Sequence, residues 1–194
     1  YEKQGMDSLY RAQMDSVLLN QRVDSETNLN VMRQLIMRSE RSDRDSTKIG
    51  NLFDSLLCQE QENADVAMLA TQYYLSKRMD EQAKKSLQQV IDIDPGNKPA
   101  HLQLLSFAIA KNDMDEIIRI CIPAVNYMPE ALEFHYYLGL AHYQKEERDK
   151  ALEVFKKGIR QITPESDKTL ASDFYAIMGD LYHLKKMNEE AYEA

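Results

Sequence analysis

Histidine is the side chain in this sequence that is best suited to bind a metal ion or to transfer protons near neutral pH. His135 and His142 lie seven residues apart in a segment of helical periodicity, so they stand two turns apart on the predicted helix. A helical zinc site of the H-E-x-x-H kind needs histidines four residues apart. The spacing is wrong for such a site, and we interpret His142 as a packing residue. The sequence predicts no metal site.

Carboxylates are the other candidates for acid–base chemistry. Glu146-Glu147 and Glu189-Glu190 are adjacent pairs, but both fall in predicted turns or helix starts, where charge serves solubility. The chain contains no G-x-S-x-G, Walker A or G-x-G-x-x-G motif, and its six glycines never cluster into a phosphate-binding loop. We therefore expect no catalytic residues and no cofactor, and an all-helical enzyme is the least favoured interpretation.

Composition limits the kinds of partner. The 194 residues carry a formal net charge of −8, and an acidic chain repels nucleic-acid phosphates. No window approaches the roughly 18 consecutive apolar residues of a membrane-spanning helix, so we expect no membrane insertion of this segment. Cytoplasm and bacterial periplasm are both left open as compartments. Cys58 and Cys121 are too few for a disulfide framework, and both lie in apolar helical segments where we expect small buried side chains.

Amphipathic helices must position any functional residue. Steps of three and four between apolar residues predict three helices before residue 63, and the third of them carries Ile49 and Phe53. Residues 24–30 are polar and are predicted to be a connection. Residues 39–48 are predicted to form a charged, serine-rich turn.

A 34-residue period organises the rest of the chain. The interval from Pro95 to Pro129 equals the intervals that separate positions 83, 117 and 151. Unrelated helical hairpins have no reason to share one period, so the period indicates a repeated helix–turn–helix unit. The segment 94–97 closes one unit, because its proline cannot continue a helix and its asparagine can cap the next one.

The clearest copy of the unit is residues 130–155, which read EALEFHYYLGLAHYQKEERDKALEVF. Leu138-Gly139 is followed by His142, Ala151 and Phe155, and this spacing resembles the tetratricopeptide repeat. The resemblance implies an all-α fold, a right-handed solenoid of antiparallel helix pairs in one continuous stack. It divides the chain into an N-terminal helix and connection (1–29), a degenerate helix pair (30–63), three repeats (64–97, 98–131 and 132–164) and an insertion with a truncated fourth repeat (165–194).

Small residues should let the two helices of a repeat approach each other. Gly139 is expected to face Ala151 and Gly179 to face Ala191, because glycine inside a helix costs up to about 1 kcal/mol and needs a packing reason. The preceding repeat has Leu105 at the glycine position. We therefore expect its helix pair to be spaced or rotated differently from the pair that contains Gly139.

The resemblance also implies a binding surface, because the first helices of successive repeats in this family line a concave groove. The family's binding positions correspond here to Met68, Gln72, Leu102, Ser106, Tyr136, Leu140, Tyr143, Asp180 and His183. Tyr136 and Tyr143 share one helix face and are the expected anchors for a partner. The six residues inserted around 165–171 predict a longer loop or an extended helix start, with a partner contact as the alternative.

Some members of the family clamp a partner's C-terminal carboxylate with lysine, asparagine and arginine. The corresponding positions here hold Met68, Gln72, Gln103, Glu133 and Tyr137. From residue 64 onward the predicted groove carries acids and neither lysine nor arginine. We therefore expect an apolar, aromatic or basic protein segment as the partner, and not a carboxylate tail.

The resemblance favours a non-catalytic scaffold that binds another protein or a peptide. The alternative is a sensory, relay or dimerisation module of a longer regulatory protein, which includes self-association. The chain starts without methionine and stops within a predicted helix, so we expect it to be a piece of a longer protein.

Overall fold

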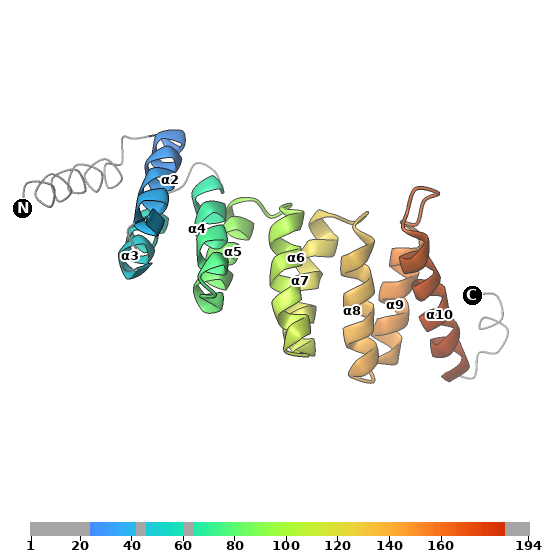
Figure 1. Cartoon of the computed structure of the whole chain (residues 1–194). Coiled ribbons are helices and arrows are strands. Elements are labelled where there is room, and N and C mark those ends of the chain that lie inside the picture. The colour runs from blue at the N-terminus through green and yellow to red at the C-terminus, as the bar shows by residue number, and fades with distance from the viewer. Residues whose placement is uncertain (1–23, 42–45, 60–63, 185–194) are drawn as a thin grey trace, which may run out of the picture. The chain divides into compact units, whose positions relative to one another are not determined.

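The computed structural model describes residues 24–41, 46–59 and 64–184, and every regular element in these ranges is an α-helix. The chain forms two compact units that meet in sequence between Asp94 and Pro95. Within each unit the described helices follow one another as stacked pairs (Figure 1). The predicted all-α solenoid architecture is confirmed. The predicted N-terminal helix and the pairing of Gly179 with Ala191 involve positions outside the described residues.

The first unit is held together by an aromatic cluster. Its described helices are α2 (Ser25–Arg41), α3 (Ser46–Leu57), α4 (Asp65–Ser76) and α5 (Asp80–Ile93). The buried ring of Phe53 on α3 lies 5.6 Å from the ring of Tyr73 and 5.9 Å from the ring of Tyr74, both on α4. The Tyr74 hydroxyl donates a hydrogen bond to the Gly50 carbonyl at 3.2 Å. Burial raises the pKa of Tyr74, so this hydroxyl stays protonated and keeps α3 joined to α4.

Two boundaries in the first unit differ from the sequence prediction. The polar connection is mostly helical, because α2 already begins at Ser25. The Asp24 carboxylate caps this start by accepting hydrogen bonds from the amide and the hydroxyl of Thr27, each at 2.8 Å. The charged turn is also shorter than predicted, since α2 continues to Arg41 and α3 begins at Ser46.

The two cysteines have different environments, and the prediction for Cys58 was wrong. Cys58 is exposed, because α3 ends at Leu57 and leaves the cysteine in the turn that follows. Cys121 is buried as predicted, and burial raises the pKa of its thiol to about 12. Cys121 is therefore a small core residue and not a reactive thiol.

The second unit contains two complete helix pairs and a further first helix. Its described helices are α6 (Lys98–Ala110), α7 (Met114–Tyr127), α8 (Leu132–Gln144), α9 (Arg148–Ile159) and α10 (Lys168–Leu184). The Asn97 side chain accepts a hydrogen bond from the Ala100 amide at 3.2 Å, so the predicted cap of α6 is confirmed. One core cluster joins α8, α9 and α10 and consists of Leu132, Ala151, Leu152, Phe155, Phe174, Met178, Leu181 and Tyr182.

The turns within the pairs α4/α5, α6/α7 and α8/α9 each use one residue of left-handed backbone. Arg78, Asn112 and Glu146 have φ values of 57°, 53° and 61° and are equally spaced along the chain. The next residue then returns its amide to a carbonyl five positions earlier, as Glu147 does to His142 at 2.9 Å. This bond satisfies a carbonyl at the helix end and reverses the chain, so the turn itself repeats with the 34-residue period.

Ring contacts explain two helical glycines of the second unit, Gly139 and Gly158. A Cβ atom at Gly139 would lie 2.7 Å from the ring of Phe155, so this ring is the nearest neighbour of the glycine. A Cβ atom at Gly158 would overlap the ring of Phe174. Sequence reasoning missed Gly158, although it lies inside α9, one residue before the helix ends, where a packing reason for glycine is needed.

The predicted insertion contains both a loop and an early helix start. In the loop after α9, the Thr163 amide donates to the Ser166 hydroxyl at 2.9 Å, and the Ser166 amide donates to the Thr163 carbonyl at 3.0 Å. The Asp167 carboxylate then accepts from two amides in the first turn of α10, at 2.8 and 2.9 Å. This cap starts α10 inside the segment predicted as an insertion.

Candidate partner-binding face

The predicted binding residues of the second unit lie on its first helices: Leu102 and Ser106 on α6, Tyr136, Leu140 and Tyr143 on α8, and Asp180 and His183 on α10. We call these residues, together with Ile109 on α6 and Asp173 and Ala176 on α10, the first-helix face. Ser106 and all four α10 residues are exposed, and Ile109 is 38% exposed. Leu102 and the three α8 residues are half-buried. The face therefore combines accessible polar positions with apolar side chains that still meet solvent.

Contacts between neighbouring first helices hold this face together. The Lys98 ammonium lies 3.0 Å from the Glu133 carboxylate, which joins α6 to α8. The ring of His101 on α6 packs edge-on against Phe134 on α8, with centroids 5.7 Å apart. The ring of Tyr136 lies 5.8 Å from that of Phe174, which joins α8 to α10.

Tyr136 is a core contact as well as a surface residue. Its ring lies 6.5 Å from Phe155 and 5.4 Å from Tyr137, in edge-on arrangements. Burial raises the pKa of its hydroxyl, and the nearby charge of Asp173 adds to this shift. Tyr143 also packs against the cluster of α8, α9 and α10. The two predicted anchors therefore support the fold, and replacing them with alanine would remove packing together with any binding contact.

The predicted binding residues of the first unit lie on α4. Gln72 is exposed, and Met68 is half-buried. Asp65 at the start of α4 is exposed, whereas Leu75 near its end is half-buried. These side chains mix polar and apolar character, as the α6 and α8 positions do.

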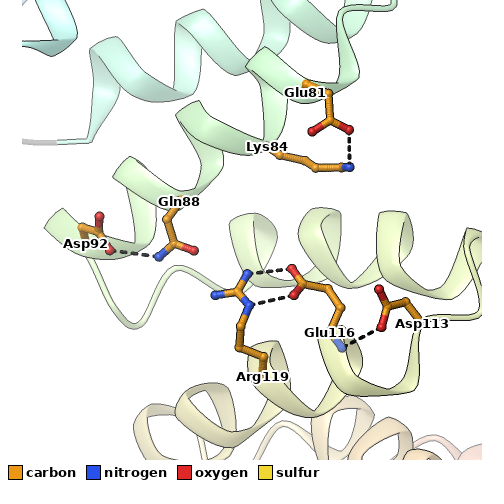
Figure 2. A network of polar contacts seen from close by, with 7 residues as sticks. All are labelled: Glu81, Lys84, Gln88, Asp92, Asp113, Glu116 and Arg119. Atoms are coloured by element: carbon orange, nitrogen blue, oxygen red, sulfur yellow. Dashed lines mark hydrogen bonds and ion pairs between the residues drawn. The ribbon is translucent and has the colours of Figure 1, made fainter.

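The second helices carry charges that pair within their own helix, as Figure 2 shows for α5 and α7. On α5 the Lys84 ammonium lies 2.8 Å from the Glu81 carboxylate. On α7 the Arg119 guanidinium meets the Glu116 carboxylate through two contacts of 2.6 and 2.7 Å. On α9 the Lys157 ammonium lies 2.7 Å from Glu153. Pairs three or four residues apart satisfy each other in water, so these charges need no partner molecule.

A family model described as tetratricopeptide repeat matches residues 66–97, the segment of α4, α5 and the closing turn. This segment of the chain is a tetratricopeptide repeat. Its presence supports a role of the chain as a protein-interaction scaffold. No curated protein matches the chain in sequence.

Solved structures of MamA share the fold of this chain. One crystal structure of MamA is 21% identical, with a TM-score of 0.52 over 80% of this chain and 87% of that chain. MamA AMB-1 is 16% identical, with a TM-score of 0.55 over 86% and 87%. MamA 41-end from Desulfovibrio magneticus RS-1 is 15% identical, with a TM-score of 0.51 over 85% and 89%. Sequence identities this low show only that the fold is shared.

The three buried histidines, His101, His135 and His142, form packing contacts that sequence reasoning only partly predicted. The buried His101 and His135 each place Nε2 against a proline carbonyl six residues earlier, at 3.0 and 2.9 Å. A carbonyl only accepts, so Nε2 carries the proton in both. The 34-residue spacing shared by His101 with His135 and by Pro95 with Pro129 was the signal that could have revealed this contact.

His142 is also a packing residue, as predicted, but it has a polar partner. It is buried, and its Nδ1 lies 2.6 Å from the Glu147 carboxylate at the start of α9. The hydrogen bonds from His142 and Lys150 lower the pKa of Glu147. Within the described ranges, no three His, Cys, Asp or Glu side chains gather closely enough to hold a metal ion. None of the helices in these ranges combines the length and the apolarity needed to cross a bilayer.

The first unit contains a small surface hollow of about 160 Å³. It is lined by Leu57, Gln59, Gln89, Asp92 and Ile93. Small-molecule sites usually measure about 300–1,000 Å³. The hollow is too small for such a ligand, so we take the first-helix face as the candidate site.

Proposed function

We propose that this chain is a scaffold that holds a segment of another protein on its first-helix face. The observation that carries the proposal is the row of partly exposed apolar side chains on α6 and α8: Leu102, Ile109, Tyr136, Leu140 and Tyr143. Aliphatic and tyrosine side chains on rigid helices can bury further area on binding with little loss of side-chain freedom. Such a row is the usual basis of a protein contact.

The contrast with the second helices supports this choice of face. Covering α7 would desolvate the paired charges of Glu116 and Arg119, which are already satisfied in water. Covering α6 and α8 would remove apolar area from water, as it would at Ile122 and Tyr127 of α7, but without covering the Glu116–Arg119 pair. In the first unit, Met68 and Gln72 occupy the same family positions on α4, and we propose them as binding residues of that unit.

The test must spare the core, so it should not use Tyr136→Ala or Tyr143→Ala. Ser106 on α6 and Ala176 on α10 are exposed, and arginine there would obstruct the face with little loss of packing. Asn126 on α7 is also exposed and provides the matched control, Asn126→Arg. Circular dichroism should give equal helicity for all three proteins.

Peptides of about twelve residues would be selected from a random display library against the unaltered chain and then titrated by fluorescence anisotropy. The Ser106→Arg, Ala176→Arg double variant should weaken their binding by about tenfold or more, because bulk at the centre of an interface blocks its anchors. The control should bind like the unaltered chain. Selected peptides that bind the double variant at full strength, or a selection that yields none, would overturn the proposal.

A further inference from the structure

We infer that the segment held on the first-helix face is cationic, and that it lays an arginine or lysine side chain against Tyr136 and Asp173. This inference rests on the proposed function and names the chemistry of its partner. It commits to a segment in which a basic residue is flanked by apolar ones. The basic residue meets the boundary of α8 and α10, and the apolar residues meet the row on α6 and α8.

The charges on the first helices indicate that the bound segment is positively charged. Among the residues of α6, α8 and α10, lysine occurs at Lys98 and Lys168, each the first residue of its helix, and arginine is absent. Lys98 is already paired with Glu133 at 3.0 Å. Asp173 and Asp180 are exposed, and neither forms an ion pair within the described part of the chain. Among the described residues, no ion pair neutralises this negative charge of the face.

The aromatic residues indicate where the basic side chain of the segment binds. Tyr136 and Tyr137 are half-exposed neighbours whose ring planes meet at 81° with centroids 5.4 Å apart, so the two rings are nearly perpendicular. Phe174 anchors α10 against Tyr136, and Asp173 directly precedes it. The position of Asp173 is close enough for its charge to act on the Tyr136 hydroxyl. A cation attracted to a tyrosine ring and to a carboxylate at the same point gains from both contacts.

Other segment chemistries fit this corner less well. A C-terminal carboxylate would face Asp173 and Asp180 with like charge. A purely apolar segment would cover Asp173 without giving its carboxylate a partner, and a buried charge without a partner is costly. A basic and apolar segment satisfies the carboxylate and buries the apolar row together.

The first experiment uses N-acetyl-arginine amide as the probe and N-acetyl-citrulline amide as its neutral counterpart of nearly the same shape. The whole chain would be labelled with ¹⁵N and titrated with each compound. Arginine should cause saturable shift changes centred on the amides of Tyr136 and Asp173, and citrulline should bind at least about three times more weakly. Shift changes centred elsewhere, or equal binding of both compounds, would overturn the inference.

Two matched variants distinguish the effect of a charge at the proposed contact from the effect of the total charge on arginine binding. Asp173→Asn removes one negative charge at the proposed contact, and Glu153→Gln removes one on the outer side of α9. Asp173→Asn should weaken arginine binding by about three- to tenfold, whereas Glu153→Gln should leave it within about twofold. Equal losses in both variants would mean a general effect of net charge and would overturn the inference.

A second experiment distinguishes failure of this inference from failure of the proposed function. Each display-selected peptide would be resynthesised with its arginines as citrulline and its lysines as glutamine. Loss of binding supports a cationic segment. Undiminished binding of the neutral peptides to the face, with sensitivity to Ser106→Arg and Ala176→Arg intact, would overturn the inference and leave the proposed function standing. Arginine binding near Asp173 without any peptide on the face would overturn the proposed function instead.

Discussion

The α6/α7 and α8/α9 helix pairs place small and large side chains in opposite positions. On α8 and α9, Gly139 lies under the ring of Phe155. The residues one repeat earlier are Leu105 on α6 and Cys121 on α7, both buried. The bulk that the α8/α9 pair takes from its second helix is thus supplied by the first helix in the α6/α7 pair. The comparison teaches that the repeat keeps its filled volume and not the identity of each residue.

The same comparison extends to the backbone of the second helices. Pro123 lies inside α7, where it cannot donate a hydrogen bond to the preceding turn, whereas α9 contains no proline. The second helix of one pair therefore has an irregularity that the other lacks. This is a physical ground for the prediction, still to be tested, that the two pairs differ in spacing or rotation.

The largest change in the free energy of unfolding is expected when Gly139 and Phe155 are replaced by the residue types found one repeat earlier. Phe155→Cys should cost about 3 kcal/mol or more, because it leaves a cavity against Gly139. Gly139→Leu should cost about 1–3 kcal/mol, because its side chain would collide with the Phe155 ring. The double variant copies Leu105 and Cys121, so its loss should fall below the sum of the single losses by about 1 kcal/mol or more.

Urea unfolding of the four proteins in this cycle measures the coupling. Phe155→Cys combined with Asn126→Ala, an exposed site on α7, provides the control and should be additive. If the loss of stability in the double variant equals the sum of the two single losses, the two helix pairs do not conserve volume between positions 139 and 155.

A smaller effect is expected at Gly158, whose counterpart in the preceding repeat is the buried Ala124. Gly158→Ala should lower the free energy of unfolding by about 1–3 kcal/mol, although alanine is the better helix former, because the added Cβ atom overlaps the Phe174 ring. Gly50→Ala on α3 is the control, since a Cβ atom there would meet Tyr74 at an ordinary 3.7 Å. Thermal unfolding should show a gain at position 50 and a loss at position 158. A gain at both positions would show that α9 and α10 shift apart at little cost.

The sequence predicted the helix pairs well, because the apolar period and the 34-residue repeat are local properties of the chain. It also predicted the cap by Asn97 and the burial of Cys121. It missed the start of α2 at Ser25, since the cap by Asp24 lay in a stretch judged only by its polarity. It wrongly buried Cys58, because helical periodicity does not reveal that a helix ends one residue earlier.

The candidate site was harder to predict than the fold. The family positions of Ser106 and Asp180 are on the surface, as a binding site requires. Yet the double role of Tyr136 depends on Phe174, which belongs to the next repeat and reaches the tyrosine only through the packing of α10. No spacing rule within one helix contains that contact. The ion pair of Lys98 with Glu133 was missed for the same reason, because it joins two repeats.

A still smaller effect separates the turns of the two pairs. Asn112 and Glu146 both have left-handed backbone, but asparagine adopts this conformation at a lower energetic cost than glutamate. Glu146→Gly should raise the free energy of unfolding by up to about 1 kcal/mol, and Asn112→Gly should change it by less than about half as much. Differential scanning calorimetry of the two variants gives the ranking. Equal gains would mean that the side chain at this position is not the source of the strain.

The smallest difference is expected in how the melting temperature changes with pH when His135 is replaced. Burial lowers the pKa of His135, and the positive charge of Lys157 lowers it further, against the hydrogen bond to Pro129, which raises it. The folded protein therefore binds a proton at His135 less readily than the unfolded chain, whose histidines titrate near 6.5. The stability due to neutral His135 is complete above pH 6.5 and is lost as the pH falls from there toward the lowered pKa. The melting temperature should thus fall less steeply between pH 7.5 and 5.5 in His135→Gln than in the unaltered chain, while the exposed-site control His183→Gln keeps the original slope. Parallel slopes in all three proteins would show that His135 is protonated in the folded protein as easily as in the unfolded one.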